Sequence, residues 1–213
     1  PPPPSSSCPT LSPTSPYPHC KITMTTWNAA AIFCSRFAVR AAARAKMSRF
    51  QHLLRRADVV CVQEAHGQPG DLDTLAREAP SHIHFGSFAP SQAAGGVLIS
   101  LSTEFVAGIN QLEEVVLAPG WCLALRCSGP QLAAQFINIH IEPALPHSCK
   151  VKLLADIANA AATFNGSTYL LGDYNFVPSD EARFKVAECK DSATLNLASS
   201  LGPKSVPYTH PTP

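Results

Sequence analysis

The sequence lacks several features that would each indicate a class of protein. None of its eight cysteines belongs to a C-x-x-C pair, which argues against a zinc ribbon or a dithiol redox site. No apolar run approaches the roughly 20 residues that a membrane-spanning helix needs, and the first residues do not have the pattern of a secretory signal. The formal net charge is only +1, so overall charge argues neither for nor against a polyanionic partner.

The remaining composition is that of an ordinary globular protein. The chain has 213 residues, 46% of them hydrophobic, which suits one domain with a sizeable core rather than two domains. The scattered cysteines suit small core positions in a reducing compartment, so we expect an intracellular protein of the cytoplasm or nucleus. We also expect a monomer and, because the chain does not begin with Met, a piece of a longer protein.

The chain divides into a tail and a domain. Residues 1–19 are mostly Pro, Ser and Thr, and such a segment cannot bury enough apolar surface to offset the entropy lost on ordering. We therefore expect a disordered tail there. From residue 20 onward, polar and apolar residues alternate or recur with helical spacing, which predicts one domain over residues 20–213.

The hydrophobic pattern predicts more strands than helices. Alternation or short β-branched runs predict strands at residues 22–28, 58–63, 82–88, 95–101, 114–117, 121–127, 135–141 and 168–172. Apolar residues spaced by three and four predict helices at residues 37–57, 71–78 and 151–164, with a further short helix near residues 192–201. Consecutive strands interrupted by few helices favour an α/β (α+β) sandwich with mixed sheets over a doubly wound parallel sheet.

Polar side chains lie at or near the ends of four predicted strands. They are Asn28, Gln63 with Glu64, Asn138 with His140, and Asp173 with Asn175. Because the ends of neighbouring strands in a sheet can converge, residues distant in the sequence can share one site. Taken singly, each also has a plain structural interpretation, such as a solvated loop residue, an Asx turn or a core histidine.

The chemistry of this set suits a phosphoester. Glu64 and Asp173 are carboxylates that could hold a hard divalent cation, Mg²⁺ or Mn²⁺. Asn28 and Asn175 could supply a neutral oxygen ligand or an amide donor to a phosphate. An imidazole such as that of His140 can donate a proton to a leaving oxygen near neutral pH.

The order of the motifs resembles that of a known superfamily. The motifs are Thr26-Trp27-Asn28, Val62-Gln63-Glu64, Gly95-Gly96-Val97, Asn138-Ile139-His140 and Leu171-Gly172-Asp173-Tyr174-Asn175. In this order they resemble the endonuclease/exonuclease/phosphatase superfamily of metal-dependent phosphoester hydrolases. Residues 172–180 are especially similar to the endonuclease domains of non-LTR retrotransposons, and Thr209-His210 resembles a later position of such domains.

The resemblance implies a four-layered sandwich, in which two packed mixed β-sheets are flanked by helices and the site lies at one end of the sheets. It implies metal ligands at Glu64, Asn28 and Asp173, with Glu64 as the main one. It implies phosphate contacts at Asn175, His140 and Asn138. Asp173, Asn175 and His140 would be catalytic, with Asp173 orienting or deprotonating a water that attacks in line.

The sequence departs from the family pattern near its end. Members carry a Ser-Arg-Ile-Asp-like strand and then a Ser-Asp-His motif, and neither is present, so we expect the last strands to be missing and the activity to be weak or absent. Three hypotheses follow. The chain is a nuclease-like phosphodiesterase acting on DNA or RNA, a phosphatase or phospholipid phosphodiesterase of the same fold, or an inactive degenerate domain that retains only binding.

Three further features each have two interpretations. The basic helix at residues 36–56 could face a nucleic-acid backbone, but a solvated outer face is favoured. His82 and His84 share one strand face as metal ligands would, but an exposed strand is favoured. Gly95-Gly96 could let a backbone approach a ligand, or could mark a tight entry into a strand.

Overall fold

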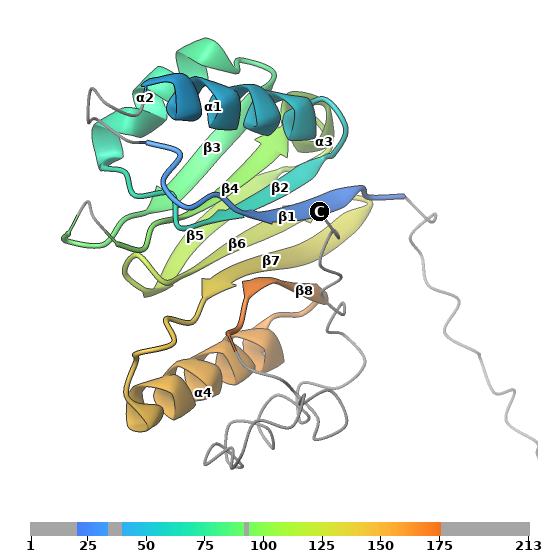
Figure 1. Ribbon diagram of the computed structural model, residues 1–213. Coiled ribbons are helices and arrows are strands. Elements are labelled where there is room, and N and C mark those ends of the chain that lie inside the picture. The colour runs from blue at the N-terminus through green and yellow to red at the C-terminus, as the bar shows by residue number, and fades with distance from the viewer. Residues whose placement is uncertain (1–20, 34–39, 92–93, 176–213) are drawn as a thin grey trace, which may run out of the picture.

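Two four-stranded β-sheets stacked face to face form the centre of the protein (Figure 1). The computed structural model describes residues 21–33, 40–91 and 94–175. The strands are β1 (Met24–Asn28), β2 (Val59–Gln63), β3 (His82–Ser87), β4 (Val97–Ser102), β5 (Gln111–Ala118), β6 (Cys122–Gly129), β7 (Leu132–His140) and β8 (Ser167–Asp173). The helices are α1 (Arg40–Leu54), α2 (Pro69–Glu78), α3 (Thr103–Val106) and α4 (His147–Thr163).

Each sheet combines parallel and antiparallel pairs. The first sheet has the order β1-β2-β4-β3 and the second has the order β5-β6-β7-β8. Only β1–β2 and β7–β8 are parallel among the described strands, and the remaining pairs are antiparallel. Because parallel neighbours need a crossover connection, α1 joins the first parallel pair and α4 joins the second.

The apolar residues divide into three clusters that define four layers. Val59 and Cys61 of β2 face the second sheet and pack in the cluster between the sheets. Val60 of β2 faces the other way and packs against α1 and α2. Ile137 of β7 packs outward against α4, around Ile157. The order helix, sheet, sheet, helix confirms the predicted four-layered sandwich with mixed sheets (Figure 1).

The predicted elements within the described residues are all present, with shifts at their ends. Helix α4 starts at His147, four residues before the predicted start, and β5 extends beyond the predicted residues 114–117. The short helix α3 was not predicted, because four residues are too few to show a helical period. Its N-terminus is capped by Ser102, whose Oγ accepts a hydrogen bond from the Phe105 amide.

Some predictions fall outside the described residues. They are the tail at residues 1–19, the short helix near residues 192–201 and the Thr209-His210 position. Within the part of the chain that is described, no helix is both long and apolar enough to cross a membrane.

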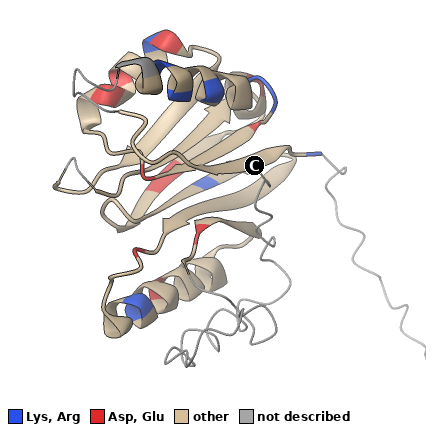
Figure 2. Ribbon diagram, in the orientation of Figure 1, with Lys and Arg blue, Asp and Glu red and all other residues tan. Residues whose placement is uncertain are grey.

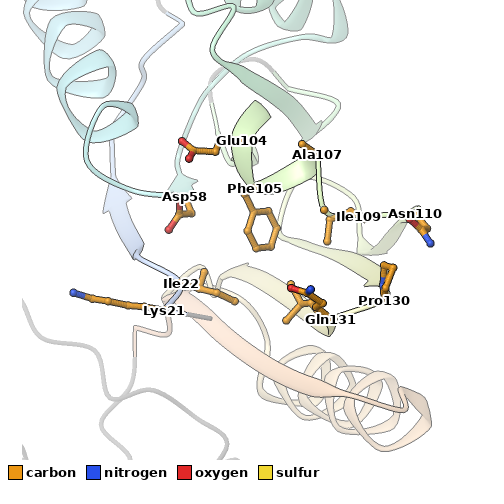
Figure 3. Close-up of a pocket in the computed structure, with 12 residues that line it drawn as sticks. Lys21, Ile22, Asp58, Glu104, Phe105, Ala107, Ile109, Asn110, Pro130 and Gln131 are labelled. Atoms are coloured by element: carbon orange, nitrogen blue, oxygen red, sulfur yellow. The ribbon is translucent and has the colours of Figure 1, made fainter. Parts of the chain in front are cut away.

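A cavity of about 560 Å³ lies where β1, β2 and β7 begin (Figure 3). Its wall combines Phe105 and Ile109 with the polar residues Lys21, Asp58 and Glu104. This is the opposite end of the sandwich from the ends of the same strands, where the polar motifs lie.

Candidate metal and phosphate site

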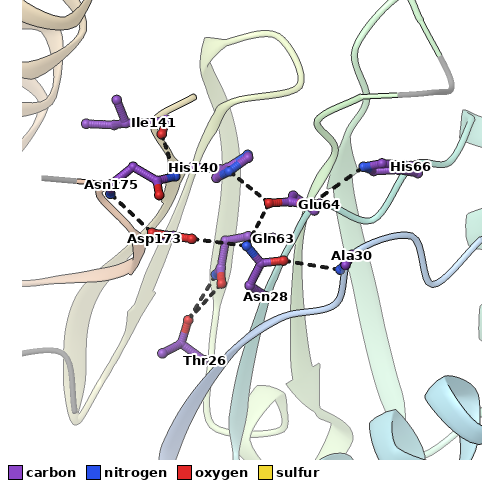
Figure 4. A network of polar contacts seen from close by, with 10 residues as sticks. All are labelled: Thr26, Asn28, Ala30, Gln63, Glu64, His66, His140, Ile141, Asp173 and Asn175. Carbon is purple, nitrogen blue, oxygen red and sulfur yellow. Dashed lines mark hydrogen bonds and ion pairs between the residues drawn. The ribbon is translucent and has the colours of Figure 1, made fainter. Parts of the chain in front are cut away.

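Four side chains from four strand ends meet in one polar cluster (Figure 4). Asn28 ends β1, Glu64 follows β2, His140 ends β7 and Asp173 ends β8. The parallel register places Asn28 beside Gln63 and His140 beside Asp173, so both pairs of strands deliver their last residues to the same end. One ligand atom each from Glu64, His140 and Asp173 lie within 4.8 Å of one another.

The amide of Asn28 holds the two carboxylates of the cluster together. Its Nδ2 donates to Glu64 Oε1 at 2.8 Å and to Asp173 Oδ2 at 3.0 Å. Its Oδ1 accepts a hydrogen bond from the Ala30 amide at 3.2 Å. Two adjacent carboxylates would otherwise repel each other, so Asn28 offsets that repulsion in the absence of a cation. In this arrangement Asn28 orients the carboxylates, and direct ligation of a metal would need the opposite amide orientation.

His140 is buried without a conventional hydrogen bond. Its side chain is only 5% exposed, and its Nε2 lies 3.2 Å from Glu64 Oε1. That approach does not meet hydrogen-bond geometry, and neither ring nitrogen has a hydrogen-bond partner among the described residues. The ring packs against Trp121, with 5.5 Å between the ring centroids. Since a buried polar atom without a partner costs free energy, the imidazole is suited to meet a ligand in the cluster.

Asn175 lies exposed at the rim of the cluster. Its backbone amide donates to Asp173 Oδ1 at 3.1 Å, which is an Asx turn, and its Nδ2 donates to Ile141 O at 2.8 Å. Asn175 therefore forms the Asx turn and also lies beside Asp173, where a phosphate contact would require it. Gly172 precedes this turn at φ +137, and a Cβ there would lie 1.9 Å from Ile139 O, so only glycine fits.

Asn138 does not line the cluster, which contradicts its predicted phosphate contact. The residue is fully buried. Its Nδ2 donates to Val62 O at 2.8 Å and to Leu98 O at 2.7 Å, and its Oδ1 accepts from Gln63 Nε2 at 2.6 Å. Because Asn138 belongs to β7 and its three partners lie on β2 and β4, it links the two sheets beneath the cluster. Strand alternation places Asn138 on the same face as His140, but it does not show that one is buried deeper.

Gln63 supports the cluster although sequence reasoning gave it no role. Besides Asn138, it contacts Thr26, where Gln63 Nε2 donates to the hydroxyl at 2.9 Å. The side chain of Gln63 on β2 is thus hydrogen-bonded to β1 and to β7, next to Asn28 and Glu64. Polar residues at inward-facing strand positions were the only sequence signal for this network.

Backbone strain is concentrated around the cluster. All described residues other than glycine with positive φ lie in the loops that follow β1, β2 and β8. They are Ala30 (45°), Ala31 (73°), Glu64 (52°), His66 (54°) and Asn175 (48°). A left-handed conformation costs a residue with a side chain about 1–2 kcal/mol. Such strain persists only where the surrounding structure enforces it, and it is common at functional sites.

The glycine pair lets two backbone segments approach closely. Gly96 O accepts from the Ala65 amide at 2.9 Å, and Gly95 O accepts from the His66 amide at 3.0 Å. Gly96 has a φ of +88, and a Cβ there would lie 3.0 Å from the His66 nitrogen. The pair therefore supports the loop that carries Glu64.

Two basic residues beside the cluster were not predicted. His66 Nε2 lies 4.0 Å from Glu64 Oε2. Burial lowers the pKa of His66, and the charge of Glu64 opposes this effect while that of Lys46 adds to it. Lys46 of α1 donates from Nζ to Ala30 O and, at 3.4 Å, to Ala31 O.

The other arginines whose side chains are described on α1, or directly after it, are exposed. Figure 2 shows Lys and Arg gathered on this helix. Arg44, Arg49, Arg55 and Arg56 are exposed, and the guanidinium of Arg49 lies over the Trp27 ring at 5.3 Å. Exposure suits the favoured interpretation, a solvated helix face.

His82 and His84 are not on an exposed strand, contrary to the favoured interpretation. His82 is buried, and its ring nitrogens pair with Ser81 Oγ and Ala57 O. The ring nitrogens of His84 pair with Ser100 Oγ and Ala79 O. Burial lowers the pKa of both imidazoles. Because all four nitrogens are engaged by the protein, the pair does not present free ligand atoms to a metal.

The donor set of the cluster fits a divalent cation. Two carboxylates with space for water are the usual protein ligands of Mg²⁺, and an added imidazole suits Mn²⁺ better than Mg²⁺. Glu64 and Asp173 supply the carboxylates, and the imidazole of His140 lies within 4.8 Å of both.

Comparisons with known proteins identify a family. Residues 25–213 match the profile of the Endonuclease/Exonuclease/phosphatase family. No curated protein matches the sequence.

Solved structures with the same fold have different substrates. The 3′ phosphatase NExo from Neisseria, bound to a product DNA hairpin, is 16% identical with a TM-score of 0.55, over 75% of this chain and 60% of that one. TDP2 from D. rerio, complexed with a single-stranded DNA product, is 17% identical with a TM-score of 0.53, over 83% and 64%. The mannosyl-6-phosphatase Bt3783 from Bacteroides thetaiotaomicron is 15% identical with a TM-score of 0.51, over 73% and 66%. The chain therefore matches less than two thirds of each of these structures, and at these identities the likeness is one of fold.

Proposed function

The chain belongs to the endonuclease/exonuclease/phosphatase family, and from that premise we propose that it is a divalent-metal-dependent phosphodiesterase acting on DNA or RNA. The family consists of metal-dependent phosphoester hydrolases. The observation that carries the proposal is the convergence of Glu64, His140 and Asp173, whose ligand atoms lie within 4.8 Å of one another.

Glu64 and Asp173 are the proposed ligands of Mg²⁺ or Mn²⁺, and Asn28 keeps both carboxylates in place. The bound cation would supply charge to polarise the phosphoryl group. Asn28 is an additional ligand if its amide reverses when the cation binds.

The remaining steps belong to side chains of the chain itself. Asp173 orients the attacking water and accepts its proton, and the water oxygen forms the new bond to phosphorus. His140 donates a proton to the oxygen that leaves as the ester bond breaks, and its burial excludes competing water. Asn175 donates to the phosphate from the second N–H group of its side-chain amide, since the first donates to Ile141 O. In-line attack places the water and the leaving oxygen on opposite sides of the phosphorus.

Three observations favour a polynucleotide over a small phosphate ester. Two of the similar structures, NExo and TDP2, are bound to DNA. Basic side chains gather on α1, and Lys46 of that helix contacts the loop beside the cluster. Residues 172–180 resemble the endonuclease domains of retrotransposons. The mannosyl-6-phosphatase likeness supports the alternative, a phosphatase of the same fold.

The test is nicking of supercoiled plasmid DNA, and cleavage of an RNA strand, by the full chain with Mg²⁺ or Mn²⁺. The matched variants are Glu64→Gln in the cluster and Glu104→Gln at the opposite end. The proposal predicts cleavage that is abolished by EDTA and by Glu64→Gln and unaffected by Glu104→Gln.

Two other outcomes would replace the proposal. Hydrolysis of sugar phosphates, inositol phosphates or sphingomyelin without nuclease activity would identify a phosphatase or phospholipid phosphodiesterase. Binding of DNA or RNA that EDTA does not change, without turnover of any of these substrates, would identify a binding domain.

A further inference from the structure

We propose that Lys46 is a positioning residue for the metal site. Its ammonium stabilises the strained turn Ala30–Ala31, and this turn sets the orientation of Asn28 and Glu64. The inference rests on the proposed function, because it concerns the same site. Lys46 lies on α1, outside the strand-end motifs, and it does not touch the carboxylates that would bind a cation.

The first observation is where the ammonium of Lys46 goes. The side chain is half-buried, whereas Arg44 and Arg49 on the same helix are exposed. Its Nζ donates to the carbonyl oxygens of two consecutive residues, Ala30 and Ala31, the latter at 3.4 Å. A lysine that only solvated the helix would extend into water, so this contact indicates a specific role.

The second observation is the conformation of those two residues. Ala30 has a φ of 45° and Ala31 a φ of 73°, in the region that favours glycine. Two consecutive alanines there need a compensating interaction to persist. The ammonium of Lys46 donates to the carbonyls of both residues and so bridges the two.

The third observation connects this turn to the cluster. The Ala30 amide donates to Asn28 Oδ1 at 3.2 Å, and that bond sets which face of the amide meets the carboxylates. The Ala31 amide donates to Glu64 O at 2.7 Å, at a residue whose own φ is positive. If the turn relaxed, Asn28 could rotate, and the bridge from its Nδ2 to Glu64 and Asp173 would be lost.

Charge alone predicts the opposite effect to positioning. A lysine ammonium near the cluster repels a cation, so its removal would strengthen cation binding if Lys46 acted only through its charge. If Lys46 positions the turn, its removal weakens cation binding. The direction of the change therefore separates the two accounts.

The experiment measures Mn²⁺ binding by the full chain from the electron paramagnetic resonance signal of free Mn²⁺. Residues that orient metal ligands typically contribute about 10- to 100-fold to affinity, so we expect Lys46→Met to weaken Mn²⁺ binding by at least about tenfold. Lys46→Arg, which can still donate to both carbonyls, should retain most of the affinity. The control Arg44→Met removes an exposed charge from the same helix and should leave the affinity unchanged.

A second variant tests the role of the turn. Glycine adopts the φ of Ala31 without strain, so Ala31→Gly in the Lys46→Met background should recover part of the lost affinity. If Lys46→Met does not fold, as judged by circular dichroism, Lys46→Ala replaces it because alanine also removes the ammonium and supplies no donor, and Ala31→Gly is then added to that variant.

The outcomes are distinct. Unchanged or tighter Mn²⁺ binding by Lys46→Met or its replacement would overturn the role of Lys46 and leave the proposed function standing. Equal losses in Lys46→Arg and Lys46→Met, with no recovery in the glycine variant, would also overturn it. Absence of Mn²⁺ binding by the unchanged chain would overturn both.

Discussion

The two ends of the sandwich have similar residues and different chemistry. At the end where β1, β2 and β7 begin, Asp58, Glu104 and Lys21 line a cavity of about 560 Å³ (Figure 3). Asp58 accepts a hydrogen bond from the Thr23 backbone amide at 2.8 Å, a bond that joins two segments of chain. At the other end, the carboxylates are bonded to an amide side chain and lie beside a buried imidazole (Figure 4).

The backbone separates the two ends as well. Every described residue other than glycine that has a positive φ lies at the cluster end, and none lines the cavity. A hollow with charged walls is thus not sufficient to indicate a site. Converging ligand atoms on a strained backbone are the better indication, because strain persists only where something enforces it.

The largest expected effect comes from breaking the cluster itself. Glu64→Gln removes one of the two carboxylates. We expect it to lower the metal-dependent cleavage rate by about 100- to 1,000-fold, because loss of a group that stabilises transition-state charge typically has an effect of this size. Initial rates at saturating metal measure this. Glu104→Gln is the matched control at the other end, and equal losses in both variants would refute the contrast.

The second effect concerns the support beneath the cluster. Asn138→Ala removes the side-chain donor to Val62 O and Leu98 O and one of the two acceptors of Gln63 Nε2, all in a buried position. We expect a loss of about 2–4 kcal/mol in the free energy of unfolding. Urea unfolding followed by circular dichroism measures it. A loss near zero would mean that Asn138 does not hold the sheets together.

The third effect is a pH dependence of stability that comes from His82 and His84 of β3. Burial lowers the pKa of His82 and of His84 in the folded state, so the unfolded chain binds more protons than the folded chain as the pH falls below about 6.5. The stability that these two residues contribute is fully present above that pH and is lost below it. Urea unfolding at several pH values between about 5 and 8 should show that the free energy of unfolding decreases as the pH falls.

The matched variant for the pH effect is His82→Gln combined with His84→Gln. Its unfolding free energy should depend less on pH over the same range, because glutamine does not titrate. An unchanged slope would assign the pH dependence to other groups, such as His66, whose pKa burial also lowers.

The smallest expected effect is at the cavity end. Asn110 is exposed on the wall of the cavity, so Asn110→Ala should change the free energy of unfolding by no more than about 0.5 kcal/mol. Mn²⁺ affinity should not change. A loss comparable to that of Asn138→Ala would show that the cavity end is as constrained as the cluster end.

Much of the fold could be predicted because its strands are strongly patterned. In β2, both faces are buried, and the run Val59–Gln63 is continuously apolar until its last residue. In α4, the apolar residues recur at helical spacing and pack on the second sheet. Element ends were less predictable, since they depend on caps such as Ser102 and on contacts from elsewhere in the chain.

The proximity of three strand-end residues could be predicted, but the arrangement of the side chains around them could not. Residue type and position at strand ends singled out Glu64, His140 and Asp173, which the structure brings together. The depth of Asn138 could not be predicted, because it depends on how the two sheets stack. Lys46 could not be predicted either, since only the path of the loop after β1 brings its ammonium to the site.

The two parallel strand pairs also bear on the kinetics of folding. Each pair is closed by a crossover through a helix, and the hydrogen bonds of Asn28 span 36 residues to Glu64 and 145 residues to Asp173. Closing long loops costs entropy before the contacts that they bring together can compensate. We therefore expect the cluster to form late in folding, so that a ligand that needs all of its members would not assist the early steps. Such a ligand would prolong the lifetime of the native state by slowing unfolding, with little effect on the rate of folding.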